Sequence, residues 1–121
     1  MNRNCLFIHT YKQNVTEGGL KAYVAHALSG RTFLANAGVG NVETFREPFT
    51  VLKRNGVKNM YEACDMDKIV NENVAKGVKK LNDLIKEFKF STKSMRWKWD
   101  KDDPEVNKGI DDMLLSNKKN M

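Results

Sequence analysis

A helical repeat of apolar residues between Met66 and Phe88 is the feature that most constrains the fold of this chain. The repeat has spacings of three or four residues and consists of Val70, Val74, Val78, Leu81, Ile85 and Phe88. Such spacing puts the apolar side chains on one stripe of an α-helix. We predict one long amphipathic helix over about 66–88, capped by Asp65 and about 35 Å long at 1.5 Å per residue. The stripe must be buried, so the other elements are expected to pack against it.

Two segments have the composition or periodicity of β-structure. Cys5–Tyr11 is rich in aromatic and β-branched residues, which predicts an N-terminal strand. Side chains alternate with a period of two between Phe88 and Trp99, which predicts a C-terminal β-hairpin over about 88–99 that turns near Lys93 and Ser94. Residues 32–35 are a further candidate strand.

Shorter helices are expected upstream of the long one. Thr16 fits a helix cap, and the apolar residues that follow at helical spacing are Leu20, Val24, Ala27 and Leu28. This helix is expected to stop at Gly30. A second helix is expected to carry Phe45, Phe49 and Leu52 on one face and to end at Asn55–Gly56.

The predicted elements define a mainly helical α+β fold. In it the 66–88 helix packs with an N-terminal strand and a C-terminal hairpin, and shorter helices surround them. The length of 121 residues fits one domain with a real core. The polar residues from about 116 to 121 are expected to form a disordered tail.

Cysteine usage and hydropathy exclude two broad classes of protein. The two cysteines, Cys5 and Cys64, are far apart, so a disulfide framework is excluded, and Cys64 is expected to be buried. The apolar run Cys5–Ile8 is far too short for a membrane span or the core of a signal peptide. We therefore expect a cytoplasmic protein, in its own cell or in a host cell, with no membrane partner.

The charge balance favours an anionic partner. Lys and Arg number 21 against 15 Asp and Glu, for a formal net charge of +6. The surplus lies upstream of residue 100, whereas residues 100–121 are mildly acidic. A positive body of this kind attracts nucleic acid or acidic protein surfaces.

Cations and aromatic rings are interleaved near the predicted hairpin, as in sites that bind unpaired bases and phosphates. The candidate binding residues are Lys76, Lys79, Lys80, Lys86, Lys89, Lys93, Arg96, Trp97, Lys98 and Trp99. Period-two alternation also permits another arrangement, in which the rings cover the long helix and the cations meet water. The sequence leaves both readings open.

A glycine-containing loop is the candidate nucleotide site. Gly38, Gly40 and Asn41 follow a possible strand and precede a helix start, where backbone N–H groups can approach a phosphate. Glu43 stands where the dinucleotide pattern has its third glycine, and a carboxylate there repels phosphate. A tight turn accounts for the two glycines equally well.

The residues that commonly carry catalysis or bind metals form no recognisable set. His9 and His26 lack the paired hydroxyl pattern of phosphoester chemistry, and His26 is expected to be exposed. Asp65 and Asp67 flank Met66 and could hold a hard cation, but helix capping is the simpler role for Asp65. We therefore predict no catalytic residue, no metal and no cofactor.

Part of the long helix also resembles a helix-pairing seam. Val74, Val78, Leu81 and Ile85 keep a coiled-coil rhythm, so a homodimer through these residues is an alternative to their burial within one domain.

These observations favour a small, basic, non-catalytic binding protein. Its expected partner is nucleic acid or a protein complex that handles nucleic acid. The main alternative is a protein inhibitor or adaptor of the phage or viral accessory type, which covers a partner protein's surface. A small enzyme or nucleotide-binding protein that uses the Gly38–Gly40 loop is the third reading.

Overall fold

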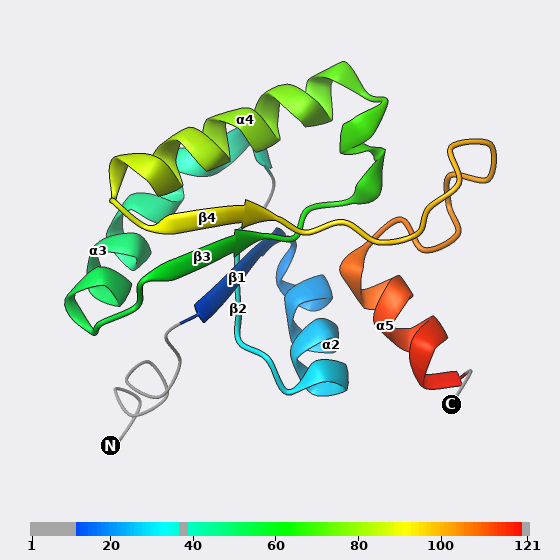
Figure 1. Cartoon of the computed structure of the whole chain (residues 1–121), viewed down its shortest axis with the longest axis horizontal. Coiled ribbons are helices and arrows are strands. Elements are labelled where there is room, and N and C mark those ends of the chain that lie inside the picture. The colour runs from blue at the N-terminus through cyan, green and yellow to red at the C-terminus, as the bar shows by residue number, and fades with distance from the viewer. Residues whose placement is uncertain (1–11, 37–38, 120–121) are drawn as a thin grey trace.

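The computed structural model describes residues 12–36 and 39–119. At its centre is a four-stranded parallel sheet with the strand order β2-β1-β3-β4 (Figure 1). The strands are β1 (Lys12–Glu17), β2 (Phe33–Asn36), β3 (Asn59–Glu62) and β4 (Ser91–Ser94). The registers pair Val15 with Leu34 on one side of β1 and Asn14 with Tyr61 on the other.

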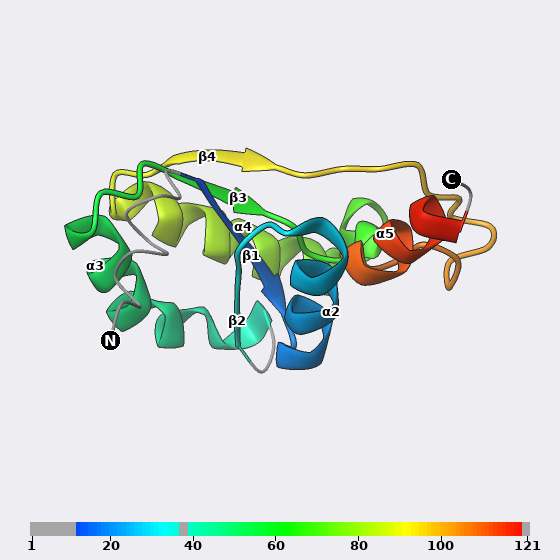
Figure 2. The ribbon, with the colours of Figure 1, turned by 90° about the horizontal axis from the view of Figure 1, so that it is seen from below.

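Helices connect the strands and follow the last one. They are α2 (Gly19–Ser29), the 3₁₀ helix η1 (Val39–Phe45), α3 (Arg46–Arg54), the 3₁₀ helix η2 (Met66–Ile69), α4 (Glu72–Glu87) and α5 (Ile110–Lys119). Figure 1 shows α4 and α3 on one side of the sheet and α2 on the other, with α5 beside α2. Figure 2, turned by 90°, shows the same separation of α3 from α2.

The direction of winding explains this division. The chain leaves β1 for β2 on one side, then crosses back over β1 to β3 and continues to β4. Parallel crossovers are right-handed, so reversing direction in the sheet moves the connecting helices to the opposite face. The reversal places a topological switch point between β1 and β3, at the edge where the parallel strands end.

The main core lies between the sheet and the α3–α4 layer. Phe49 of α3 is fully buried and stacks on Phe45, with ring centroids 5.4 Å apart. Phe90 meets Phe49 edge to face at 5.6 Å. Val15, Met60, Leu81 and Ile85 complete this layer at 0–1% exposure. The shared face of Phe45, Phe49 and Leu52 is therefore confirmed.

The predicted fold class, a mixed α and β domain, is confirmed, but the long helix is shorter than expected. It divides into η2 and α4 at Val70–Asn71, and Val70 is 56% exposed. Asn71 Oδ1 accepts hydrogen bonds from the Asn73 and Val74 backbone N–H groups at 3.0 and 3.3 Å and so caps α4. The prediction of Asp65 as a cap is wrong, because its side chain makes no capping hydrogen bond.

The predicted hairpin over 88–99 is also wrong. Its one strand, β4, runs parallel to β3, with Asn59 opposite Ser91. Lys89, at φ 64°, turns the chain out of α4 in the left-handed conformation. Residues 95–99 form no second strand and lead from β4 towards α5.

The first helix begins later than predicted and buries a different face. Thr16 lies in β1, and α2 starts at Gly19. Ala22 and Ala25 are buried, whereas Leu20 and Tyr23 are 79% and 69% exposed. Small residues on the buried face let the helix approach the sheet closely.

Several boundaries agree with the sequence and others do not. Residues 33–36 form the expected second strand. Gly30 and Gly56 end helices in the left-handed conformation, with φ of 73° and 88°. The predicted strand over Cys5–Tyr11 lies outside the described residues. Helix α5 continues to Lys119, whereas a disordered tail was expected from about 116.

The predicted dimer seam is used inside the domain. Val78, Leu81 and Ile85 belong to the core cluster, and Val74 packs against it. These side chains are therefore not available for a homodimer interface. Within the described part of the chain, no helix is both long enough and apolar enough to cross a bilayer.

Candidate functional site

The edge of the sheet where the parallel strands end brings together segments that are far apart in the chain. The turn after β1 contributes Gly18 and Gly19, and the segment after β3 contributes Asp65 and Asp67. Ligands of open α/β sheets bind at this edge, next to the topological switch point. The edge is therefore the first place to look for a functional site.

The start of α2 has the properties of an anion site. Gly18 has φ 83°, a conformation that residues with a Cβ rarely adopt, and it offers no side-chain cap. The N–H groups of Gly19 and Leu20, in the first turn, have no acceptor within the helix. Together with the helix dipole they favour a negatively charged group at this end.

Asp65 faces this helix from the other side of the switch point. Its side chain is only 9% exposed and its Oδ1 lies 2.5 Å from Lys21 Nζ, so α2 and the end of β3 are joined by an ion pair. The N–H of Met66 donates to the Lys108 carbonyl at 2.8 Å, which joins the same segment to the start of α5.

Helix α5 adds further carboxylates at this point. A Cβ placed on Gly109 would lie 2.5 Å from Asp111 Oδ1 and 3.3 Å from Asp65 Oδ1. Both carboxylates therefore converge on a glycine that has no room for a side chain. Asp112 Oδ2 accepts a long hydrogen bond, 3.4 Å, from the Gly109 N–H. We call Lys21, Asp65, Gly109, Asp111 and Asp112 the switch-point cluster.

The carboxylates of the switch-point cluster outnumber its one ammonium group. Burial, reinforced by the charge of Asp112, raises the pKa of the Asp111 carboxyl, while the nearby Lys21 opposes the shift. Asp111 Oδ1 and Asp67 Oδ1 are buried atoms that find no hydrogen-bond partner among the described residues. Carboxylate oxygens in this state favour a nearby cation.

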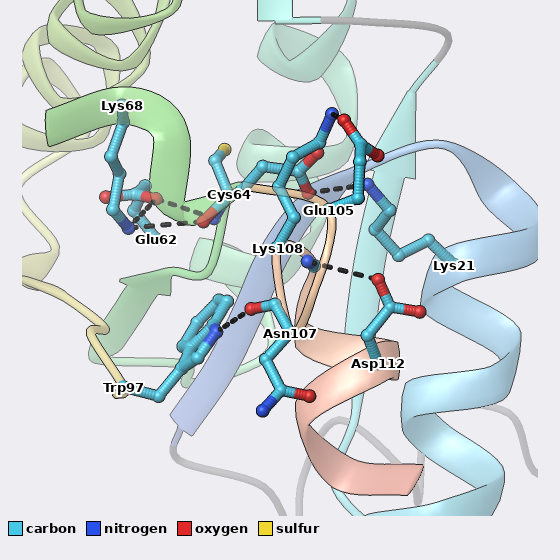
Figure 3. A network of polar contacts seen from close by, with 11 residues as sticks. Lys21, Glu62, Cys64, Lys68, Trp97, Glu105, Asn107, Lys108 and Asp112 are labelled. Atoms are coloured by element: carbon cyan, nitrogen blue, oxygen red, sulfur yellow. Dashed lines mark hydrogen bonds and ion pairs between the residues drawn. The ribbon is translucent and has the colours of Figure 1, made fainter. Parts of the chain in front are cut away.

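A buried ion pair holds the segment that carries Asp65. Glu62, at the end of β3, is fully buried, and its Oε2 lies 2.8 Å from Lys68 Nζ. Lys68 Nζ also donates to the Cys64 and Met95 carbonyls, and the Cys64 N–H donates to Glu62 Oε2 at 2.6 Å. Figure 3 shows Lys68 reaching back over Cys64 to Glu62. The turn after β3 is thereby closed on itself, and Cys64 is buried as expected.

The two tryptophans act differently from the predicted stacking platforms. Trp97 is half-buried, with its Nε1 donating to the Asn107 carbonyl at 2.7 Å, and Trp99 Nε1 donates to Pro104 at 3.0 Å. Lys68 Nζ lies 5.7 Å from the centre of the Trp97 ring. Both indoles therefore fix the segment that leads from β4 to α5.

The predicted cations are divided among different surfaces. Lys79, Lys86 and Arg96 line one groove between α4 and β4. Lys80 lines a separate hollow whose charged lining includes Arg46, Glu43, Asp83 and Glu87. The remaining predicted cations, Lys76, Lys89, Lys93 and Lys98, are exposed and line neither hollow.

The predicted glycine loop is only partly described. Gly38 lies outside the described residues, Gly40 is in η1, and Asn41 is exposed. The glycines that lie at the switch point are instead Gly18 and Gly19, which have no part in the predicted nucleotide site. Their position between a strand and a helix was the signal that could have identified them.

A larger hollow than the two lined by predicted cations lies elsewhere. It has a volume of about 690 Å³ and is lined by Phe33, Leu34, Pro48 and Val51, with Glu47 as its charged residue. It lies between β2 and α3, and its lining is mainly apolar, with Gln13, Thr32 and Thr44 as its uncharged polar residues. His26 is exposed as predicted, with Nδ1 2.7 Å from the Arg31 carbonyl oxygen.

Within the described residues, no group of three or more His, Cys, Asp and Glu side chains is arranged to enclose a metal ion. The described carboxylates of the switch-point cluster therefore do not form a complete protein cage for a metal ion. Comparison of the chain with protein-family models, with curated proteins and with solved structures finds no match.

Proposed function

We propose that this protein handles nucleic acid and that the switch-point cluster binds a phosphate group of that nucleic acid together with a divalent cation such as Mg²⁺. The observation that carries the proposal is the convergence of Asp65, Asp111 and the uncapped start of α2 at the switch point of a parallel sheet. The helix end favours the phosphate, and the carboxylates favour the cation.

A cation is needed because phosphate and carboxylates repel each other. Without one, the charges of Asp65 and Asp111 oppose an anion at the start of α2, and Lys21 offsets that repulsion in part. Mg²⁺ in proteins is commonly held by one or two carboxylates, several waters and the phosphate itself. Two converging carboxylates without a complete protein cage match that pattern.

The overall charge supports nucleic acid over a free nucleotide. The net charge is +6, and many of the exposed cations of α4 and the segment after β4 lie outside the switch-point cluster. Such cations contact the repeating phosphates of a polymer, whereas a mononucleotide has no charge beyond the site itself.

The test is binding of a labelled single-stranded oligonucleotide, measured by fluorescence anisotropy, with and without Mg²⁺. We expect Mg²⁺ to strengthen binding to the wild type, and we expect Asp65→Asn to lose this strengthening while it keeps the salt-dependent binding seen without Mg²⁺. Asp102→Asn, an exposed acid outside the cluster, is the matched control and should behave as wild type.

Because Asp65 also pairs with Lys21, circular dichroism must show that the Asp65→Asn protein is folded. Asp67→Asn is a second variant at the same edge, and we expect it to reduce the effect of Mg²⁺ without breaking that ion pair. Equal strengthening by Mg²⁺ in the wild type and in both edge variants would contradict the proposal.

A second candidate function is phosphoryl transfer at the same edge. The specific observation is that the Asp111 carboxyl, whose pKa is raised by burial, lies close to the Lys21 side chain, because a perturbed carboxyl beside a charged partner is common at catalytic sites. Phosphoryl transfer needs mainly positioning and a metal ion that neutralises developing charge. Gel analysis of a labelled oligonucleotide, incubated with the protein and Mg²⁺ or Mn²⁺, tests for changed product length, and Asp65→Asn should abolish any change.

A further inference from the structure

A groove between α4 and β4 concentrates cations beside the switch-point edge. It has a volume of about 390 Å³, and the residues that matter here are Lys68, Lys79, Asn82, Lys86, Ser94 and Arg96. We call it the α4–β4 groove. Asp83 is the one acidic residue in its lining, against four cations.

The cations of the groove differ in how far they are already neutralised. Lys68 is committed to the buried Glu62, and Lys79 makes an exposed ion pair with Asp83 at 3.0 Å. An exposed pair of this kind holds its partners weakly. Lys86 and Arg96 are exposed and make no ion pair with any residue in the described ranges 12–36 and 39–119. Two cations therefore remain to meet an external anion.

The wall of the groove is polar and ordered. Asn82 of α4 spans to β4 through long hydrogen bonds of 3.4 Å with Ser94 Oγ and with Thr92 Oγ1. The apolar residues of the lining, Ala75 and Val78, are small, and Val78 is 7% exposed. Protein interfaces depend on large buried aromatic or aliphatic anchors, which this groove does not offer. A polar, cationic groove suits a sugar–phosphate backbone better.

The direction of the groove links it to the switch-point edge. Lys68 follows β3 and Arg96 follows β4, so that end of the groove opens where the strands end. Lys79 and Lys86 continue along α4 over about 10 Å at 1.5 Å per residue. In a duplex each strand carries a charge about every 3.4 Å of helix axis, and an unpaired strand is more extended, so this length spans at most about three phosphates.

We infer that the α4–β4 groove is a track for the backbone of one nucleic-acid strand, which leads that strand to the switch-point cluster. The inference rests on the proposed function for the identity of the polymer, and it adds the path, the contacting residues and the preference for a single strand. Lys86 and Arg96 contact phosphates, and Asn82 and Ser94 contact sugar or phosphate oxygens.

The experiment measures oligonucleotide affinity by anisotropy at several salt concentrations for Lys86→Gln/Arg96→Gln and for a control, Arg31→Gln/Arg54→Gln. Both variants remove two exposed positive charges, but Arg31 and Arg54 lie on the β2 side and at the end of α3. Each lost phosphate contact reduces the slope of log affinity against log salt by about 0.7 for single strands. We expect a slope reduced by about 1.4 for the groove variant and unchanged for the control.

Two competitors test the partner and its form. We expect a duplex of the same sequence to bind more weakly than the single strand, and poly-glutamate to compete poorly. Equal losses in both double variants would show an effect of net charge alone and would overturn the inference, as would an unchanged slope in the groove variant. A duplex bound more tightly and insensitive to Lys86→Gln/Arg96→Gln would also overturn it, and so would efficient competition by poly-glutamate.

The groove and the proposed Mg²⁺ site can fail separately. Strengthening of binding by Mg²⁺ should survive in Lys86→Gln/Arg96→Gln, because neither residue belongs to the switch-point cluster. A reduced salt slope in this variant, combined with no effect of Asp65→Asn or Asp67→Asn on the Mg²⁺ response, would support the groove and remove the cation site.

Discussion

Removal of one partner from the Glu62–Lys68 ion pair should destabilise the protein strongly. Lys68→Met keeps the length and most of the volume of the side chain but deletes the ammonium. It leaves Glu62 fully buried, with the Cys64 N–H as the remaining hydrogen bond of Oε2, and Oε1 already has no partner in the described structure. The Cys64 and Met95 carbonyls also lose a donor.

The expected loss is about 3–5 kcal/mol of unfolding free energy, as for other buried charges left without their partner. For a chain of this length, a change of 1 kcal/mol shifts Tm by about 4 °C, so the midpoint should fall by about 12–20 °C. Lys86→Met makes the same substitution at an exposed site of α4 and should change stability by less than about 0.5 kcal/mol.

Urea unfolding followed by circular dichroism gives the free energies, and tryptophan fluorescence reports on Trp97 beside Lys68. A double-mutant cycle with Glu62→Leu completes the test. The double variant should lose about 2–3 kcal/mol less than the sum of the two single losses, because neither charge remains buried alone. A Lys68→Met loss below about 1 kcal/mol, or strictly additive losses, would refute the reasoning.

Three further predictions concern single residues. Asn71→Ala removes the cap of α4 and should cost about 1 kcal/mol in chemical denaturation, whereas Asn73→Ala, an exposed control in the same turn, should cost much less. Gly56→Ala forces a Cβ into the left-handed region at φ 88° and should cost about 1–2 kcal/mol, although no atom blocks the Cβ. Asp111→Asn should raise Tm at pH 7. Burial raises the folded-state pKa of Asp111, so ionisation of this carboxyl destabilises the fold above that pKa. The gain in Tm from Asp111→Asn should vanish below the ordinary pKa near 3.8, because Asp111 is then protonated in both the folded and the unfolded chain. Thermal scans at pH 7 and pH 3.5 check this last sign, and a gain that persists at pH 3.5 would contradict it.

Parts of the fold that depend on local periodicity could be predicted from the sequence. The stripe Val78, Leu81 and Ile85 is buried as expected, because a helix with one apolar face must cover it. Gly56 ends a helix because its backbone conformation is a local property. The same reasoning failed at Val70, where Asn71 offers a better cap and starts a new helix.

Apart from β2, which was expected as a strand, the sheet could not be predicted in the same way, because its strands are short and lack apolar alternation. Strand β4 reads Ser-Thr-Lys-Ser and is an edge strand, so pairing with β3 decides its conformation. In β1, Gln13, Asn14 and Thr16 are buried although they are polar. These residues are buried because the strand lies inside the sheet. That position depends on pairing with distant strands and cannot be predicted from a local stretch of sequence.

The candidate site was missed for a related reason. Lys21, Asp65 and Gly109 become neighbours through the strand order and through the hydrogen bond from Met66 to Lys108, so their sequence spacing carries no signal. The available local signals were two polar turns, Gly18–Gly19 and Asp65–Asp67, each after a short strand. Without a sheet, both positions are explained as the first turns of helices capped by Thr16 and Asp65.

Strand β1, one of the two inner strands, is synthesised early. β1 is synthesised before both of its neighbours, and about 45 residues separate it from β3. At about 5–20 residues per second, translation takes about 2–9 seconds to supply that partner. During this time an apolar strand would be open to aggregation, but Lys12–Glu17 contains one aliphatic residue, Val15. A strand of this composition, polar at Gln13, Asn14 and Thr16, has little tendency to aggregate before its neighbouring strands are available.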